Sequence, residues 1–166
     1  MLLTLGACRS SSSSSTPKLS AADAATTVAS AFALPDDQKA CLEQGFHDHP
    51  EAIRPLATDG TANDTDLEAL GRVEDGCIQL TTLSNAIVTG AAAGFGSITD
   101  QQRACLPTAI GALSDDDRVT LLVGLTVPQS LSDAKATELG RVTNGVLDTC
   151  HLTLDTPATG PATTTP

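Results

Sequence analysis

Four cysteines are the residues in this chain whose type and spacing point most directly to chemistry. The 166-residue sequence has Cys41, Cys77, Cys105 and Cys150, together with a further Cys8 near its start. Zinc sites usually take their ligands from close pairs such as C-x-x-C, and the sequence contains no such pair. We therefore expect disulfide bonds at these four positions rather than a metal site or a catalytic thiol.

An internal repeat indicates how the cysteines pair. The segment LPDDQKACL at 34–42 matches ITDQQRACL at 98–106, and LGRV occurs at both 70–73 and 139–142. The second copy has a longer connector between its two matching segments. Each copy has an Ala-rich segment before it that ends in a phenylalanine, Phe32 or Phe95.

Four cysteines allow three pairings, and the repeat favours Cys41–Cys77 and Cys105–Cys150, one bond in each copy. Each bond joins the first helix of a copy to its closing helix, at positions that we expect to be buried. In the chain-entropy model, closing a loop of about 35–45 residues stabilises a protein by about 3–4 kcal/mol. Structural disulfides form outside the reducing cytosol, so the pairing predicts an exported protein.

Two histidines form the clearest alternative site. His47 and His49 flank one aspartate, and His47 is four residues from both Glu43 and Glu51, a spacing that suits a helical metal site. Pro50 is expected to end the helix there, and the second copy has no equivalent histidines. We favour a solvated helix end over a metal site.

Acidic residues gather at two further places. A calcium site is one interpretation of the first group, although the EF-hand spacing is absent, and a helix cap Thr65-x-x-Glu68 explains it equally well. That group consists of Asp59, Asn63, Asp64 and Asp66. The run 115–117 is all aspartate, as suits the first turn of a helix.

No motif in the sequence predicts catalysis or a cofactor. The nucleophile-elbow, P-loop and dinucleotide fingerprints are all absent. Gly71-Arg72 recurs as Gly140-Arg141, and a repeated glycine within a helix suggests that another helix approaches closely. We expect each arginine to pair with an acidic residue of its own unit, with a functional arginine pair as the less favoured alternative.

The elements that must position these residues are helical. Apolar residues recur at helical spacing, capping pairs begin at Ser20, Thr65, Thr99 and Ser114, and no sustained alternation predicts a strand. The fold class is therefore all-α, with helices near 20–33, 36–48, 51–57, 65–91, 99–112, 115–125 and 132–152. Because aromatic residues make up 2% of the chain, the core must be aliphatic.

The charge of the chain disfavours some partners. Its formal net charge is −11, from 9 basic and 20 acidic residues. Nucleic acid is disfavoured because phosphate contacts need clustered Lys and Arg, and adsorption to anionic membranes by charge alone is disfavoured for the same reason. The sequence has no apolar run of about 18–20 residues that would predict a transmembrane helix.

Cys8 is the odd cysteine, and its context suggests a lipid anchor. Leu5-Gly6-Ala7-Cys8 resembles a bacterial lipobox, and Ser10–Ser15 soon after it is a typical flexible tether. The seven residues before Cys8 lack the basic start of a signal peptide, so we expect the true start to lie upstream. The alternative is a cytosolic protein in which Cys8 is a free thiol.

These features divide the chain into five segments. They are a truncated-looking signal segment at 1–7, a lipidated tether at 8–19, helical unit 1 at 20–90, helical unit 2 at 91–153, and a disordered Thr/Pro-rich tail at 154–166. The two disulfide-clasped units are expected to pack as a small helical bundle.

The unit resembles small helical modules of exported actinobacterial proteins, in which an apolar residue stands seven positions before a Cys and a closing helix ends in a second Cys. Here these are Leu34 with Cys41 and Cys77, and Ile98 with Cys105 and Cys150. The resemblance implies location and fold but no activity. We expect a non-enzymatic cell-envelope lipoprotein that presents a helical surface to an envelope protein or a small ligand. The alternatives are an envelope enzyme, such as a hydrolase, or a structural spacer.

The anchor is testable by metabolic labelling. Cells that export the protein and grow on an alkyne analogue of palmitate should incorporate the label, because Cys8 would carry the lipid. The Cys8→Ala variant should lose the label entirely, whereas the neighbouring Ser11→Ala variant should keep it. Unlabelled wild-type protein would contradict the anchor.

Overall fold

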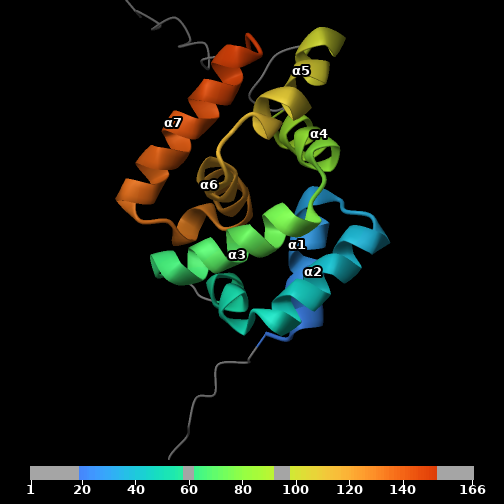
Figure 1. Cartoon of the computed structure of the whole chain (residues 1–166), viewed down its shortest axis with the longest axis vertical. Helices are drawn as coiled ribbons and strands as arrows, with labels where there is room; N and C mark the ends of the chain where they lie inside the picture. The colour runs from blue at the N-terminus through green and yellow to red at the C-terminus, as the bar shows by residue number, and fades with distance from the viewer. Residues whose placement is uncertain (1–18, 58–61, 92–97, 153–166) are drawn as a thin grey trace, which may run out of the picture.

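The computed structural model describes residues 19–57, 62–91 and 98–152, and every element within these ranges is helical. The all-α fold class is thus confirmed (Figure 1). The elements are α1 Ala21–Phe32, α2 Asp36–Asp48, η1 Pro50–Ala57, α3 Asp64–Cys77, α4 Leu80–Ala91, α5 Asp100–Gly111, α6 Asp115–Thr126, η2 Pro128–Ser130 and α7 Asp133–Thr149.

Side-chain caps set most of the helix starts. Ser20 and Ser114 each accept a hydrogen bond from the backbone N–H three residues later, and Thr99 forms a complete capping box with Gln102. The predicted cap at Thr65 is wrong. Asn63 is the cap instead, because its Oδ1 accepts from the backbone N–H of Asp66 at 2.8 Å, so α3 begins before Thr65.

The predicted single helix at 65–91 is also wrong, because α3 ends at Cys77 and α4 begins at Leu80. Ile78 leaves the helix in an extended conformation (φ −92°, ψ 118°) and buries its side chain in the core. Gln38 of α2, itself buried, holds the break: its Oε1 accepts from the backbone N–H of Gln79 and its Nε2 donates to Thr82. Burial of one apolar side chain and two tertiary hydrogen bonds of Gln38 therefore override local helical periodicity.

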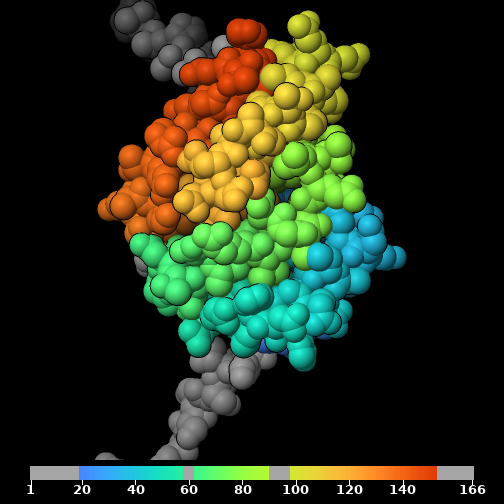
Figure 2. All heavy atoms as spheres, viewed as in Figure 1, coloured from blue at the N-terminus to red at the C-terminus, as the bar shows by residue number. Residues whose placement is uncertain are grey.

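Helix α3 is central. It packs against α2 and η1 of the first copy and against α6 of the second, while α4 lies on α5 and α7 packs on both α5 and α6. Figure 2 shows the second copy, coloured yellow to red, stacked on the first along the long axis. Buried aliphatic side chains of both copies form one continuous core. Its largest fully buried apolar members include Phe46, Leu42, Leu70, Leu83, Leu106, Ile110 and Leu122.

Both predicted disulfides are confirmed. Cys41 is bonded to Cys77 and Cys105 to Cys150, with Cα–Cα distances of 5.5 and 5.6 Å. They tie α2 to the end of α3 and α5 to the end of α7. The expected burial holds only for Cys150; Cys77 and Cys105 are half-buried and Cys41 is exposed. On α2 the core-facing position belongs to Leu42, one residue further on.

The repeated glycines differ in role. A methyl group on Gly71 would lie 2.6 Å from Cγ1 of Val119 and 2.9 Å from the Val119 carbonyl oxygen, so α3 and α6 are in close contact there. Gly140 has open space where its methyl group would be, so the predicted close approach is confirmed at Gly71 and wrong at Gly140. Gly124 of α6 performs the corresponding role toward Leu139 of α7.

Several predictions fall outside the described residues. These are the signal segment, Cys8 and its tether as far as residue 18, Asp59, Phe95, and the tail at 154–166. The division into two units at 90/91 stays a prediction. Within 19–57, 62–91 and 98–152, no helix is long and apolar enough to span a membrane.

The two glycines make a matched pair for a stability test. Gly71→Ala should destabilise the fold by about 1–3 kcal/mol, because the methyl group meets the backbone of α6, which cannot move without separating the helices. Gly140→Ala should stabilise it by up to about 1 kcal/mol, since alanine is the better helix former and meets no neighbour. Urea denaturation measures both, and equal effects would contradict the close contact at Gly71.

Candidate functional site

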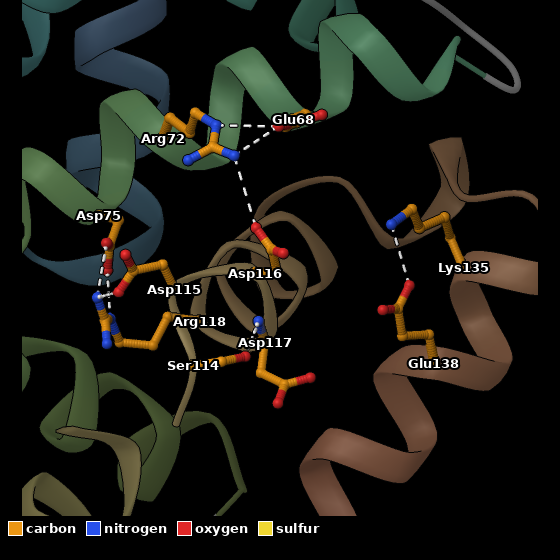
Figure 3. Close-up of polar contacts among 10 residues, drawn as sticks. All are labelled: Glu68, Arg72, Asp75, Ser114, Asp115, Asp116, Asp117, Arg118, Lys135 and Glu138. Carbon is orange, nitrogen blue, oxygen red and sulfur yellow. Dashed lines mark hydrogen bonds and ion pairs between the residues drawn. The ribbon is translucent and has the colours of Figure 1, made fainter. Parts of the chain in front are cut away.

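A cleft lies where α3 faces α6 and α7, at the junction of the two copies. Its volume is about 280 Å³, and residues of both copies line it. Figure 3 shows several of its polar side chains converging from the three helices. The lining residues are Asp64, Leu67, Glu68, Asp116, Val119, Thr120, Val123, Leu131, Lys135 and Glu138.

The floor of the cleft is apolar and closely packed. Leu67 of α3 and Val119 and Val123 of α6 are at most 7% exposed and belong to the core, and half-buried Leu131 packs against it. These valines are the ones that contact Gly71. The floor is therefore fixed by the same close contact that joins the two copies.

The rim of the cleft is acidic. Asp64, Glu68, Asp116 and Glu138 supply four carboxylates, against one ammonium from Lys135. The Lys135 Nζ lies 3.0 Å from Oε2 of Glu138 (Figure 3). This hydrogen bond raises the pKa of Lys135, and the charges of Glu138, Asp64 and Glu68 raise it further. The cleft therefore has a negative field that favours bound cations.

Arg72 bridges two of the residues that line the cleft. Its guanidinium lies 2.6 Å from Glu68 on its own helix and 3.5 Å from Asp116 on α6 (Figure 3). Arg141 pairs with Asp117. Each arginine thus has the acidic partner from its own unit that the sequence predicts, and Arg72 also bridges the two copies. A functional arginine pair is not supported, because the two guanidiniums bind different carboxylates on different helices.

One polar side chain in the cleft has no protein partner. Thr120 is 7% exposed and lines the cleft. Threonines in helices usually donate to the carbonyl four residues earlier, as Thr137 does. Within the described residues, the Thr120 hydroxyl makes no such hydrogen bond. The buried side-chain atoms without a partner there are Oε2 of Glu74 and Oγ of Ser130, so the Thr120 oxygen is accessible from the cleft. Its hydrogen-bonding capacity is therefore open to a bound molecule.

A second, wider groove runs between α2 and α3. Its volume is about 740 Å³, and it is lined by the Cys41–Cys77 disulfide together with His49, Arg72 and Glu68. Glu68 lines both hollows, so they flank α3 on two sides. This groove is the more open of the two, and its arginine is already paired.

The histidines do not form a site together. The imidazole of His47 is 79% exposed and lies 3.4 Å from Asp48, whereas His49 contacts Glu51 at 3.2 Å. Among the described residues, no group of three or more potential ligands is placed to hold a metal ion. Asp66 is turned away into a contact with Arg54 and Asn63, which separates it from Asp64 in the cleft.

Sequence reasoning missed the α6–α7 side of the cleft. Lys135 and Glu138 are three residues apart, which is the spacing of a helical ion pair, so their contact can be predicted from the sequence. Their proximity to Glu68 and Asp64 was not, because it depends on how α7 packs against α6. Thr120 carries no sequence signal at all.

The sequence analysis also missed Glu74, the only fully buried charged side chain among the described residues. Its Oε1 accepts a hydrogen bond from the Thr126 hydroxyl at 2.7 Å, while its Oε2 has no partner there. Burial raises its pKa from 4.5 to about 8. The sequence does indicate the burial of Glu74, since this residue lies four positions after Leu70 and therefore on the apolar stripe of α3. Glu74 lines neither hollow.

Comparisons with known proteins give no relative from which to transfer a function. The chain matches no protein-family model, no curated protein and no solved structure. The resemblance to exported actinobacterial modules therefore stays a prediction, and the argument for function depends on the geometry of the cleft.

Glu74 gives the fold a distinctive pH dependence. A carboxyl whose pKa rises from 4.5 to about 8 on folding contributes stability below pH 4.5 that is lost as the pH rises toward 8. The loss is at most about 1.4 kcal/mol per pH unit. In Glu74→Gln this loss should disappear, so the variant should be more stable than wild type at pH 8.

Urea denaturation at pH 5, 6, 7 and 8 measures the difference. Glu43 is exposed on α2, so Glu43→Gln is the matched control and should keep the wild-type profile. Parallel pH profiles for wild type and Glu74→Gln would mean that Glu74 is not protonated in the folded protein.

Proposed function

We propose that this protein is a non-enzymatic, lipid-anchored protein of the cell envelope that binds a small ligand in the cleft between its two copies. The observation that carries the proposal is the cleft itself: a closely packed apolar floor, a charged rim and a hydroxyl without a partner among the described residues. Small-molecule sites are typically concave and mostly apolar with a few directed polar groups. A volume of about 280 Å³ suits a ligand of small size.

The environment of the cleft favours binding over catalysis. Catalytic acids and bases often have shifted pKa values and lie in a cleft, but the buried carboxyl with a strongly raised pKa, Glu74, lies outside both hollows. Among the described residues, neither histidine, serine nor cysteine lines the cleft. These features support a binding role over the alternative of an envelope hydrolase.

The disulfides indicate the compartment in which the protein works. Two disulfide bonds indicate an oxidising environment outside the cytosol. The lipid on Cys8 is part of the proposal, and it would hold the cleft close to the outer face of the cell membrane. There it would meet small molecules of the envelope, whereas a net charge of −11 opposes nucleic acid.

The proposal is testable by equilibrium dialysis. The full chain with both disulfides, kept unlipidated by Cys8→Ser, is dialysed against a small-molecule extract of the cells that produce it, and retained compounds are identified by mass spectrometry. Wild type should concentrate at least one compound. Thr120→Met should lose it by about tenfold or more, because the longer side chain fills the cleft.

Thr89→Val is the control, since Thr89 is exposed on α4 and is not a lining residue of the cleft. Retention that is equal in wild type and Thr120→Met would overturn the cleft as the site. Conversion of the retained compound into a product would favour the enzyme, and retention of no compound would favour the structural spacer.

A further inference from the structure

The chemistry of the cleft lining restricts the class of ligand. We propose that the cleft binds a small aliphatic amine, with the ammonium between the rim carboxylates and Thr120 and the hydrocarbon part on the apolar floor. This inference rests on the proposed function and adds the ligand class to it.

Charge is the first argument. The lining has four carboxylates and one ammonium, and Arg72 at the edge adds a guanidinium that Glu68 and Asp116 already hold. An anion would meet carboxylates from all three helices. A divalent metal ion is also disfavoured, because no group of ligands in the described part of the chain is placed to hold one. A monovalent organic cation is the remaining charged ligand.

Lys135 shows how the cleft treats such a group. Its alkyl chain leaves α7, and its ammonium contacts Glu138 while the charges of Asp64 and Glu68 add to the attraction. Lys135 is thus an alkylammonium that the chain itself supplies. A free amine of similar chemistry would meet the same field, and it would compete with Lys135 for the same carboxylates.

Asp64 is the carboxylate available to a ligand. Glu138 is bound to Lys135 and Glu68 to Arg72, whereas Asp64 makes no ion pair with any residue that the structure describes. Its place in the first turn of α3 is favourable for a carboxylate, so the helix explains why an acid is tolerated there. The position in the helix does not account for the fact that Asp64 lines the same cleft as the Thr120 hydroxyl.

Thr120 is the independent second observation. An ammonium donates three hydrogen bonds and accepts none, so it needs neutral acceptors besides carboxylates. Thr120 is 7% exposed as a residue and lines the cleft, and its hydroxyl has no partner among the described residues, so its oxygen is free to accept. Leu67, Val119 and Val123, which line the same cleft, give the hydrocarbon part of the ligand an apolar surface.

The cleft volume sets the size of the ligand. About 280 Å³ is close to the lower end of the range for small-molecule sites, about 300–1,000 Å³. An amine with an aliphatic chain of about five carbons fits such a space, and a folded protein does not. A lysine side chain on an extended peptide shares the chemistry, so the experiment separates the free amine from the peptide.

The test is isothermal titration calorimetry on the full Cys8→Ser chain with both disulfides formed. The probes are pentylamine, 1,5-diaminopentane, pentan-1-ol, pentanoate and a lysine with both backbone ends blocked. The two amines should bind more tightly than the alcohol and pentanoate. Tighter binding by free amines than by blocked lysine supports a small-molecule ligand, and the reverse order supports a peptide lysine; both outcomes support an aliphatic ammonium.

Variants locate the site. Asp64→Asn should weaken pentylamine binding at least about threefold, and Thr120→Val should weaken it about tenfold, since it keeps the shape and removes the acceptor. Lys135→Met should tighten binding about threefold, because it removes the competing ammonium. Asp36→Asn is the matched control, as Asp36 is the first residue of α2, as Asp64 is of α3.

Three results would overturn the inference: equal binding of pentan-1-ol and pentylamine, no binding of either amine, or amine binding that Asp64→Asn and Asp36→Asn affect equally. The first two leave the proposed function intact if the dialysis compound still depends on Thr120. If that compound is also insensitive to Thr120→Met, the proposed function fails as well.

Discussion

The rest of the structure depends on the close contact of α3 with α6 at Gly71. With no side chain there, the valines of α6 reach the backbone of α3, and the cores of the two copies become one. An aliphatic core with 2% aromatic residues buries little area per side chain, so tight packing between helices matters more than usual. Gly124 extends the same principle to α7, and the disulfides hold the ends of α3 and α7 against their partners.

The cleft follows from this packing. Its floor consists of side chains that the contact at Gly71 holds in place, and its rim consists of polar residues where α3, α6 and α7 diverge. Arg72 spans one edge by binding carboxylates from both copies. The site therefore belongs to neither copy alone, since the first supplies Asp64 and the second supplies Thr120 and Lys135.

Glu74 is a different kind of polar group. It is buried at the contact of α3 with the end of α6, where Thr126 satisfies only one of its oxygens. Burial keeps it protonated near neutral pH, since its pKa is raised to about 8. A buried carboxylic acid can stabilise a contact without charge, and here its cost appears only as the pH rises. The second copy has Thr143 at the corresponding position, so it has no equivalent of this buried acid.

The sequence by itself determined the helical class, most helix bounds and the disulfide pairing, because these depend on local periodicity, capping and an internal repeat. It indicated that Arg72 and Arg141 pair with acidic residues of their own units, but not that these residues are Glu68 and Asp117. It failed where distant residues decide: the break at Ile78 depends on Gln38, and the difference between Gly71 and Gly140 depends on which glycine faces another helix. Only the tertiary structure decided that Asp64, Thr120 and Lys135 share one cleft. The physical reason is that packing angles between helices arise from the fit of whole surfaces, which no short motif encodes.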